Sequence, residues 1–269
     1  MAELMRHPRL PLVLRAVVLG VLVVAATACV TTSSRPTPKP GPAGEAAQYN
    51  LQLGITYLRQ NNLQAARLKL EKALEQAPDL ATAHAALGLV FERLEDPVGA
   101  ERHYRRAVDL DSSDPDNLNA LAVFTCSRKQ DPREALKLFD RAIGIPLSVS
   151  AANRPMLYTN AGTCAKSVDL ARSEAYLRGA LAEDPLFPDA LFQLAEVTLE
   201  RGNALQARGF LERYLARVKA TSAALWLGVR IEQAMNDNAA AARYGEQLRR
   251  EFPESAEIRL LDGLSRSPG

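Results

Sequence analysis

The chain has little of what an enzyme, a metal site or a disulfide-stapled miniprotein needs. Only three of its 269 residues are histidine, three are cysteine, and aromatic residues make up 6%. No pair of histidines or cysteines has the spacing of a metal site, and no glycine-rich loop precedes a lysine that could hold a phosphate. We therefore expect no catalytic residue, no bound metal and no cofactor.

An excess of charge of one sign is also missing. Lys and Arg number 33 against 31 Asp and Glu, which gives a formal net charge of +2. Nucleic-acid binders use a one-sided basic field to displace counterions from phosphates. We therefore expect no nucleic-acid partner.

The one long apolar run, residues 16–28, follows Arg6, Arg9 and Arg15 in the sequence. At ~1.5 Å per residue, a helix of this length covers less than about two thirds of a ~30 Å hydrocarbon core, which is too short for a lasting span. A basic segment followed by a short apolar run and small residues is typical of an export signal. We therefore predict that residues 1–28 are a signal peptide.

The small residues 26–28 lead into Cys29 and resemble the lipobox of bacterial lipoproteins, in which the cysteine is lipidated. Ala26 stands where the lipobox usually has leucine, so ordinary signal cleavage with an unmodified Cys29 is the alternative. Val30 follows, and lipoproteins without aspartate at this place generally reach the outer membrane. The resemblance implies a lipid anchor at the periplasmic face of the outer membrane. The proline-rich residues 29–45 predict an extended linker after the anchor.

The remainder of the sequence repeats itself with a period of 34 residues. Gly54 and Tyr57, for example, recur 34 residues later as Gly88 and Phe91. This is the tetratricopeptide-repeat (TPR) pattern, in which small residues let two helices approach closely while large ones fill the seam. Alternating β-branched runs with Asn-Gly turns, which would indicate strands, do not occur.

The fold prediction is therefore all-α: a right-handed superhelix of six TPR helical hairpins plus a C-terminal capping helix. The TPR domain is expected at residues 46–269. Its repeats are expected near 47–80, 81–114, 115–148, 154–187, 188–220 and 221–254, with the capping helix at 255–264. A longer loop from Gly144 to Asn153 separates the third and fourth repeats.

Cys126 and Cys164 are the two thiols that remain if Cys29 is lipidated. Export delivers them to an oxidising compartment, and both fall late in the first helix of consecutive repeats. Because such helices stack side by side, we predict a disulfide between them. The alternative is two buried small apolar side chains.

Stacked hairpins line a concave groove with their first helices, and this groove is the predicted site for a protein partner. In the generic repeat geometry the second, fifth, ninth and twelfth places face it. The predicted groove residues are Gln48, Leu51, Ile55, Leu58, Thr82, Ala85, Leu89, Glu92, Asn119 and Val123. The alternative is that about half of them merely pack against neighbouring helices.

Three other side chains have structural interpretations. His84 stands at a packing place of its repeat, so we expect a role in the core or at the groove edge rather than a metal or a base. His103 is expected to be solvated. Trp226 is expected to pack in the core rather than to contact a partner.

Several motifs go beyond the general TPR pattern. They are Asn160-Ala161-Gly162 before Cys164, Phe210-Leu211 before Arg213-Tyr214, and Leu225-Trp226-Leu227-Gly228 before Arg230-Ile231. With the lipobox, the six repeats and the interior cysteines, they resemble the type IV pilus biogenesis and stability lipoproteins, the PilF/PilW family. Ala122 departs from the family, which tends to have glycine there.

The resemblance implies a pilotin, which is a monomeric outer-membrane lipoprotein that binds the type IV pilus secretin subunit and assists its localisation and multimerisation. A general periplasmic TPR lipoprotein adaptor for cell-wall or outer-membrane assembly machinery is the alternative. An enzyme is the rival from a different class, and it would need a convergent polar pocket that the sequence does not suggest.

Overall fold

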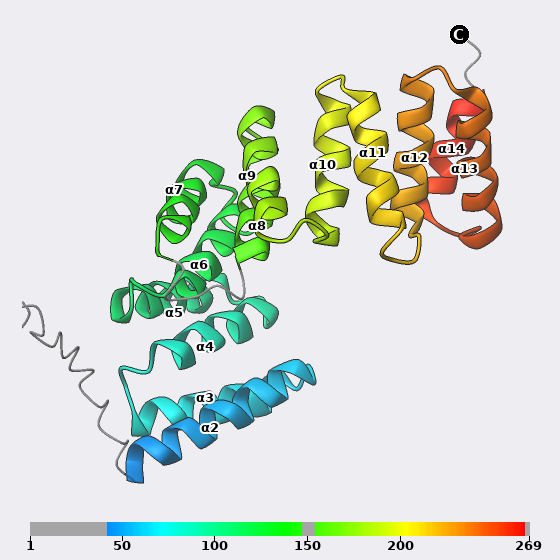
Figure 1. Ribbon diagram of the computed structural model, residues 1–269. Coiled ribbons are helices and arrows are strands. Elements are labelled where there is room, and N and C mark those ends of the chain that lie inside the picture. Colours follow the sequence, from blue (N-terminus) through cyan, green and yellow to red (C-terminus); the bar gives the residue numbers. More distant parts are fainter. Residues whose placement is uncertain (1–41, 147–153, 267–269) are drawn as a thin grey trace, which may run out of the picture. The chain divides into compact units, whose positions relative to one another are not determined.

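The computed structural model describes residues 42–146 and 154–266, and within them the chain forms thirteen helices and no strand (Figure 1). In chain order they are α2 (Pro42–Arg59), α3 (Leu63–Gln76), α4 (Ala81–Arg93), α5 (Pro97–Leu110), α6 (Pro115–Ser127), α7 (Pro132–Ile143), α8 (Arg154–Ala165), α9 (Leu170–Glu183), α10 (Pro188–Glu200), α11 (Ala204–Leu215), α12 (Ser222–Ala234), α13 (Asn238–Glu251) and α14 (Ala256–Arg266). The predicted all-α fold of six hairpins and a closing helix is confirmed.

Aspartate side chains begin several of these helices. Asp96, Asp131 and Asp237 each accept a hydrogen bond from the backbone N–H three residues later. Pro97 and Pro132 follow directly, at a place where a missing N–H costs nothing. These caps set where the second helix of each of these hairpins starts.

The first helix, α2, begins at Pro42, inside the segment that the sequence assigned to the linker. Proline suits the first position of a helix, and Glu45 places a negative charge at the positive end of the helix dipole. The helix therefore starts several residues earlier than the repeat pattern alone indicates.

Small residues let the two helices of a hairpin approach closely. A Cβ atom added to Gly88 on α4 would lie 2.6 Å from the ring of Tyr104 on α5, a distance that real Cβ atoms do not reach. Ala66 and Ala100 on the second helices are fully buried. The spacing of glycine and alanine therefore determines how tightly each hairpin closes.

Consecutive hairpins stack on one another. The second helix of each hairpin packs against the first helix of the next, and successive first helices also touch, from α2 through α4, α6, α8 and α10 to α12. One buried apolar cluster runs from α2 to α8, a second from α9 to α12, and a third joins α12 to α14. Successive first helices therefore lie side by side.

Candidate protein-binding groove

The residues predicted to line the groove lie on three consecutive first helices, α2, α4 and α6. Eight of them keep access to solvent: Gln48, Ile55, Thr82, Ala85, Leu89, Glu92, Asn119 and Val123. Leu51 and Leu58 are only 3% and 7% exposed. The prediction is wrong for these two because α2 packs against both α3 and α4, which places them in the core.

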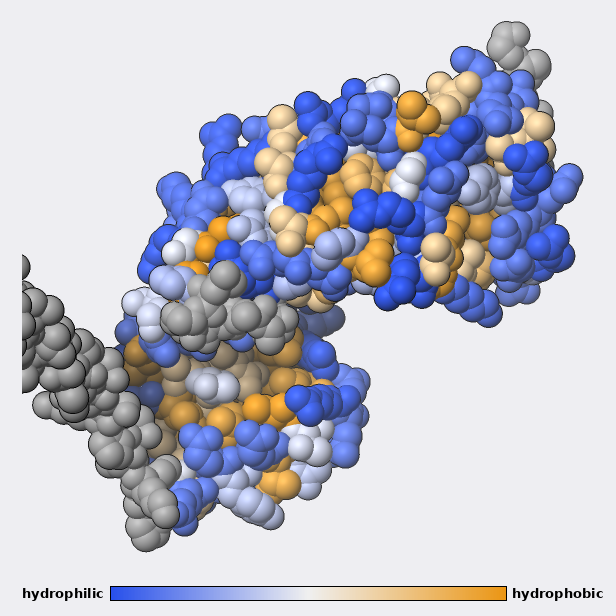
Figure 2. Space-filling model, viewed as in Figure 1, coloured by the Kyte–Doolittle hydropathy of each residue, from blue (hydrophilic) through white to orange (hydrophobic). Residues whose placement is uncertain are grey.

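One position recurs on every first helix and distinguishes the repeats. It directly follows the small residue that touches the second helix, and we call its members the ninth-place row: Ile55, Leu89, Val123, Thr163, Glu196 and Val229. The first three are half-buried and apolar, one on each of α2, α4 and α6. Thr163 and Glu196 are polar, and Val229 is buried in the cluster that contains Leu261 of α14. The apolar stripe therefore ends after the third repeat. In Figure 2 apolar side chains are visible on the surface over α2 to α4.

A hollow of about 250 Å³ lies where α8 and α10 adjoin, and we call it the α8–α10 hollow. Its apolar lining comes from Met156, Phe192 and Tyr214, and the rings of the last two pack with centroids 5.4 Å apart. Its polar lining comes from Thr159, Asn160, Thr163, Asp189 and Gln193. Sequence reasoning missed this hollow, although Thr163 belongs to the ninth-place row.

Lys166, just beyond the end of α8, joins that helix to α10. Its Nζ atom lies 3.3 Å from a carboxylate oxygen of Glu196 and 2.8 Å from one of Glu200. Burial alone would lower the pKa of Lys166, but the hydrogen bonds that its ammonium donates to Glu200 and Glu196, and the charges of these carboxylates, raise it overall. In the neighbouring pair of first helices, Asn160 donates a hydrogen bond of 3.1 Å to the side-chain oxygen of Asn119. Polar contacts therefore connect α6, α8 and α10 along this face.

The two interior cysteines form a disulfide, as the sequence led us to expect. Cys126 on α6 and Cys164 on α8 are bonded, with Cα atoms 6.0 Å apart. The bond links the third repeat to the fourth. Part of the intervening loop, residues 147–153, lies outside the described residues.

His84 and His103 form a pair that sequence reasoning missed. Their Nδ1 atoms are 3.0 Å apart, and Nε2 of His84 lies 3.1 Å from the carbonyl oxygen of Pro78. His103 also stacks on Phe91, with centroids 5.2 Å apart. Burial, together with the charges of His84 and Arg102, lowers the pKa of His103 to about 4. The expectation that His103 is solvated is wrong, because His103 on α5 packs against His84 and Phe91 of α4.

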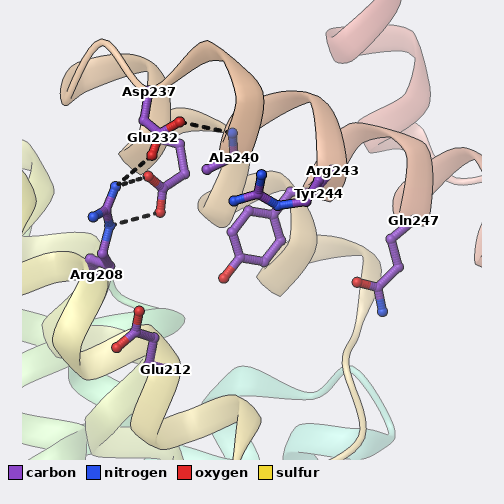
Figure 3. A pocket seen from close by; sticks show the side chains of 8 residues that line it. All are labelled: Arg208, Glu212, Glu232, Asp237, Ala240, Arg243, Tyr244 and Gln247. Carbon is purple, nitrogen blue, oxygen red and sulfur yellow. Dashed lines mark hydrogen bonds and ion pairs between the residues drawn. The ribbon is translucent and has the colours of Figure 1, made fainter.

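A second hollow, of about 400 Å³, lies between α11, α12 and α13 (Figure 3). Arg208 on α11 makes two hydrogen bonds to the carboxylate of Glu232, which is 3% exposed. The side chain of Tyr244 projects into the hollow, and burial raises its pKa. The charge pair links the fifth repeat to the sixth.

A repeated spacing could have revealed this charge pair. Glu232 follows Gly228 by four residues, as Glu92 follows Gly88. Glu92 is likewise held by charge, through an ion pair with Arg128 of the next repeat.

The predicted lipidation site, Cys29, and the predicted signal peptide lie outside the described residues. Among residues 42–146 and 154–266, no helix is long and apolar enough to cross a membrane. Nor does any group of three or more His, Cys, Asp and Glu gather there to hold a metal ion.

Comparison with known proteins agrees with this architecture. The tetratricopeptide repeat family model matches residues 51–115 and 166–224. The type IV pilus assembly protein PilF of Pseudomonas aeruginosa is 28% identical over 245 residues, which cover 90% of this chain and 96% of that protein.

Two solved structures are similar over most of their length. The crystal structure of PilW, a type IV pilus biogenesis factor, gives a TM-score of 0.74 at 27% identity and covers 80% of this chain and 97% of PilW. The structure of Pseudomonas aeruginosa PilF gives a TM-score of 0.74 at 28% identity, with 83% of this chain and 99% of PilF covered. The chain is homologous to PilF and PilW and belongs to the TPR family of type IV pilus biogenesis proteins.

Proposed function

We propose that this protein is an outer-membrane pilotin, which binds the type IV pilus secretin and promotes its localisation and multimerisation in the outer membrane. Homology to PilF and PilW supports a scaffold role in type IV pilus biogenesis. The proposal rests mainly on one observation: the ninth-place row is apolar on the first three first helices, α2, α4 and α6. Ile55, Leu89 and Val123 offer matching apolar contacts on three adjacent helices.

The energetics of such a groove suit reversible binding of a subunit. Burying about 300 Å² of apolar surface contributes roughly 8 kcal/mol at ~25 cal/mol per Å². Much of this is offset by the entropy lost on association. Polar residues at the edge, such as Gln48 and Thr82, can hydrogen-bond the partner without adding much affinity.

The proposed lipid anchor explains how binding promotes assembly. Several acyl chains at Cys29, each contributing ~0.8 kcal/mol per buried CH₂, would make attachment to the membrane effectively permanent. The linker that follows could extend up to about 40 Å at ~3.1 Å per residue. Tethering raises the local concentration of a bound subunit at the membrane, which favours ring assembly without a covalent step.

A double variant tests the groove. Ile55→Asp with Leu89→Asp places two charges in the apolar row and should abolish secretin multimers on unheated gels. The matched control is Leu68→Asp on α3, because Leu68 is 67% exposed and lies on a second helix. Circular dichroism should stay helical for both. Unchanged multimers in the double variant would refute the assignment of the groove.

A separate variant tests the anchor. Cys29→Ser should move the protein from the outer-membrane fraction of a sucrose gradient to the periplasmic extract. Secretin rings should then decrease or form at the wrong membrane. If deleting the gene leaves rings intact while another envelope assembly pathway fails, the general adaptor function would replace the pilotin.

A further inference from the structure

The α8–α10 hollow differs in chemistry from the apolar groove of the first three repeats. Its volume of about 250 Å³ lies just below the range of roughly 300–1,000 Å³ that is usual for small-molecule sites. Met156, Phe192 and Tyr214 give it an apolar side, and Met156 is 41% exposed. These dimensions suit one large apolar side chain of a bound peptide better than a separate small ligand.

The amide groups beside the hollow match the backbone of an extended chain. Asn160 and Gln193 each carry both a donor and an acceptor. Asn160 uses one N–H toward Asn119, and its oxygen is not involved in that bond. A helix satisfies its own backbone groups, whereas an extended segment leaves its N–H and C=O groups free for such contacts.

The charges of α10 and of its partner Lys166, beside the hollow, sum to a negative value. Helix α10 carries Asp189, Glu196 and Glu200 and no Lys or Arg. Lys166 pairs with the two glutamates, so the three carboxylates and one ammonium leave a formal charge of −2. Arg154 at the start of α8 is already paired with Glu183.

Asp189 is the one charged side chain that lines the hollow itself. It is exposed, and no ion pair holds it within the part of the chain that the structure describes. Its carboxylate is therefore available to a cation carried by a partner.

From these observations we propose that the α8–α10 hollow is a second docking site, for an extended segment of a partner protein in which a large apolar side chain adjoins a lysine or arginine. The apolar side chain packs on Phe192 and Met156, and the cation pairs with Asp189. The site is separate from the apolar row on α2, α4 and α6. One molecule could therefore hold two segments of different chemistry at once.

The test uses the purified protein and a defined probe. The probe is a fluorescein-labelled, acetylated peptide, Gly-Ser-Leu-Lys-Leu-Lys-Ser-Gly, and fluorescence anisotropy measures its binding. A second peptide has glutamate in place of both lysines. We expect the lysine peptide to bind and the glutamate peptide to bind at least about tenfold more weakly, a difference of roughly 1.4 kcal/mol.

Two exposed residues are changed to block the hollow: Asp189→Lys reverses its charge, and Thr163→Arg fills it. Each should weaken binding of the lysine peptide about tenfold or more. Asp109→Lys, at an exposed carboxylate on the second helix α5, makes the same charge change elsewhere and should leave the affinity unchanged. Circular dichroism verifies that all three variants are folded.

The outcomes separate this site from the pilotin proposal. The double variant Ile55→Asp and Leu89→Asp should bind the lysine peptide as the wild type does, whatever its effect on the secretin. No binding by the wild type, equal binding of the two peptides, or equal loss in Asp109→Lys would overturn the second site. None of these results would affect the role of the apolar row in secretin assembly.

Discussion

The first three repeats and the next two differ at one equivalent position of the first helix, which is apolar in the first region and polar in the second. In the first region the ninth-place row carries Ile55, Leu89 and Val123, and in the second it carries Thr163 and Glu196. The residue just before each of these is glycine or alanine in both regions, because the second helix passes close to it. Helix packing therefore requires a small residue at the first of these two positions. It does not restrict the residue type at the next position, which can vary with the partner.

The largest expected effect comes from removing the disulfide that joins the two regions. The bond spans 38 residues of sequence, and the loop-entropy model assigns such a link about 4 kcal/mol. Cys126→Ala with Cys164→Ala should lower the free energy of unfolding by about this amount. Urea denaturation followed by circular dichroism measures it, and the two regions should begin to unfold separately.

Reductant provides the control for that measurement. The wild type in dithiothreitol should match the double alanine variant, and the variant itself should not respond to dithiothreitol. Denaturation curves that coincide with and without the bond would contradict the prediction.

A smaller effect is the pH dependence of stability, which should arise in the first region because both histidines of the TPR domain, His84 and His103, lie there. The pKa of His103 is about 4 in the folded protein, against 6.5 for a free histidine. Between these two pH values the unfolded chain binds more protons than the folded protein. The contribution of His103 to the free energy of unfolding should therefore be fully present above pH 6.5 and be lost as the pH falls toward 4. The pair is only partly buried, and after allowance for solvent screening we expect a loss of about 1 kcal/mol.

The variant His103→Gln tests the origin of this acid sensitivity. It cannot take up the proton, so its free energy of unfolding should change less between pH 6.5 and pH 4 than that of the wild type. The same dependence in both proteins would mean that other groups cause it.

The smallest expected effect concerns the polar region. Lys166→Met removes the ion pairs with Glu196 and Glu200, which are partly exposed. Stability should decrease by only about 0.5 kcal/mol. Because the surface becomes more negative, the lysine peptide should bind more tightly in the anisotropy assay. Weaker binding would mean that Lys166 itself contacts the peptide.

The sequence was sufficient for the fold because the repeat pattern acts locally. Gly88 and Tyr104 are 16 residues apart, a distance that one hairpin brings together, so their spacing alone predicts the contact. The same holds for the pairing of Cys126 with Cys164, since both occupy equivalent ends of neighbouring first helices.

The groove was less predictable because it depends on how neighbouring helices overlap. Repeat geometry assigned Leu51 and Leu58 to the concave face, but it does not say how much of that face α4 covers. His103 was misjudged for a similar reason, because its contact with His84 depends on the register of α4 against α5. The α8–α10 hollow requires side chains from three helices, and no spacing in one repeat predicts that.

The closing helix α14 has a consequence for how such a protein can change in evolution. Leu261 of α14 packs in one cluster with Val229, so the exposed end of the last hairpin is already occupied. An extra hairpin duplicated after α13 would have to displace α14 and leave its apolar side without a neighbour. Duplications within the array meet no such obstacle. A hairpin gained within the array would leave the contact between α14 and α12 intact.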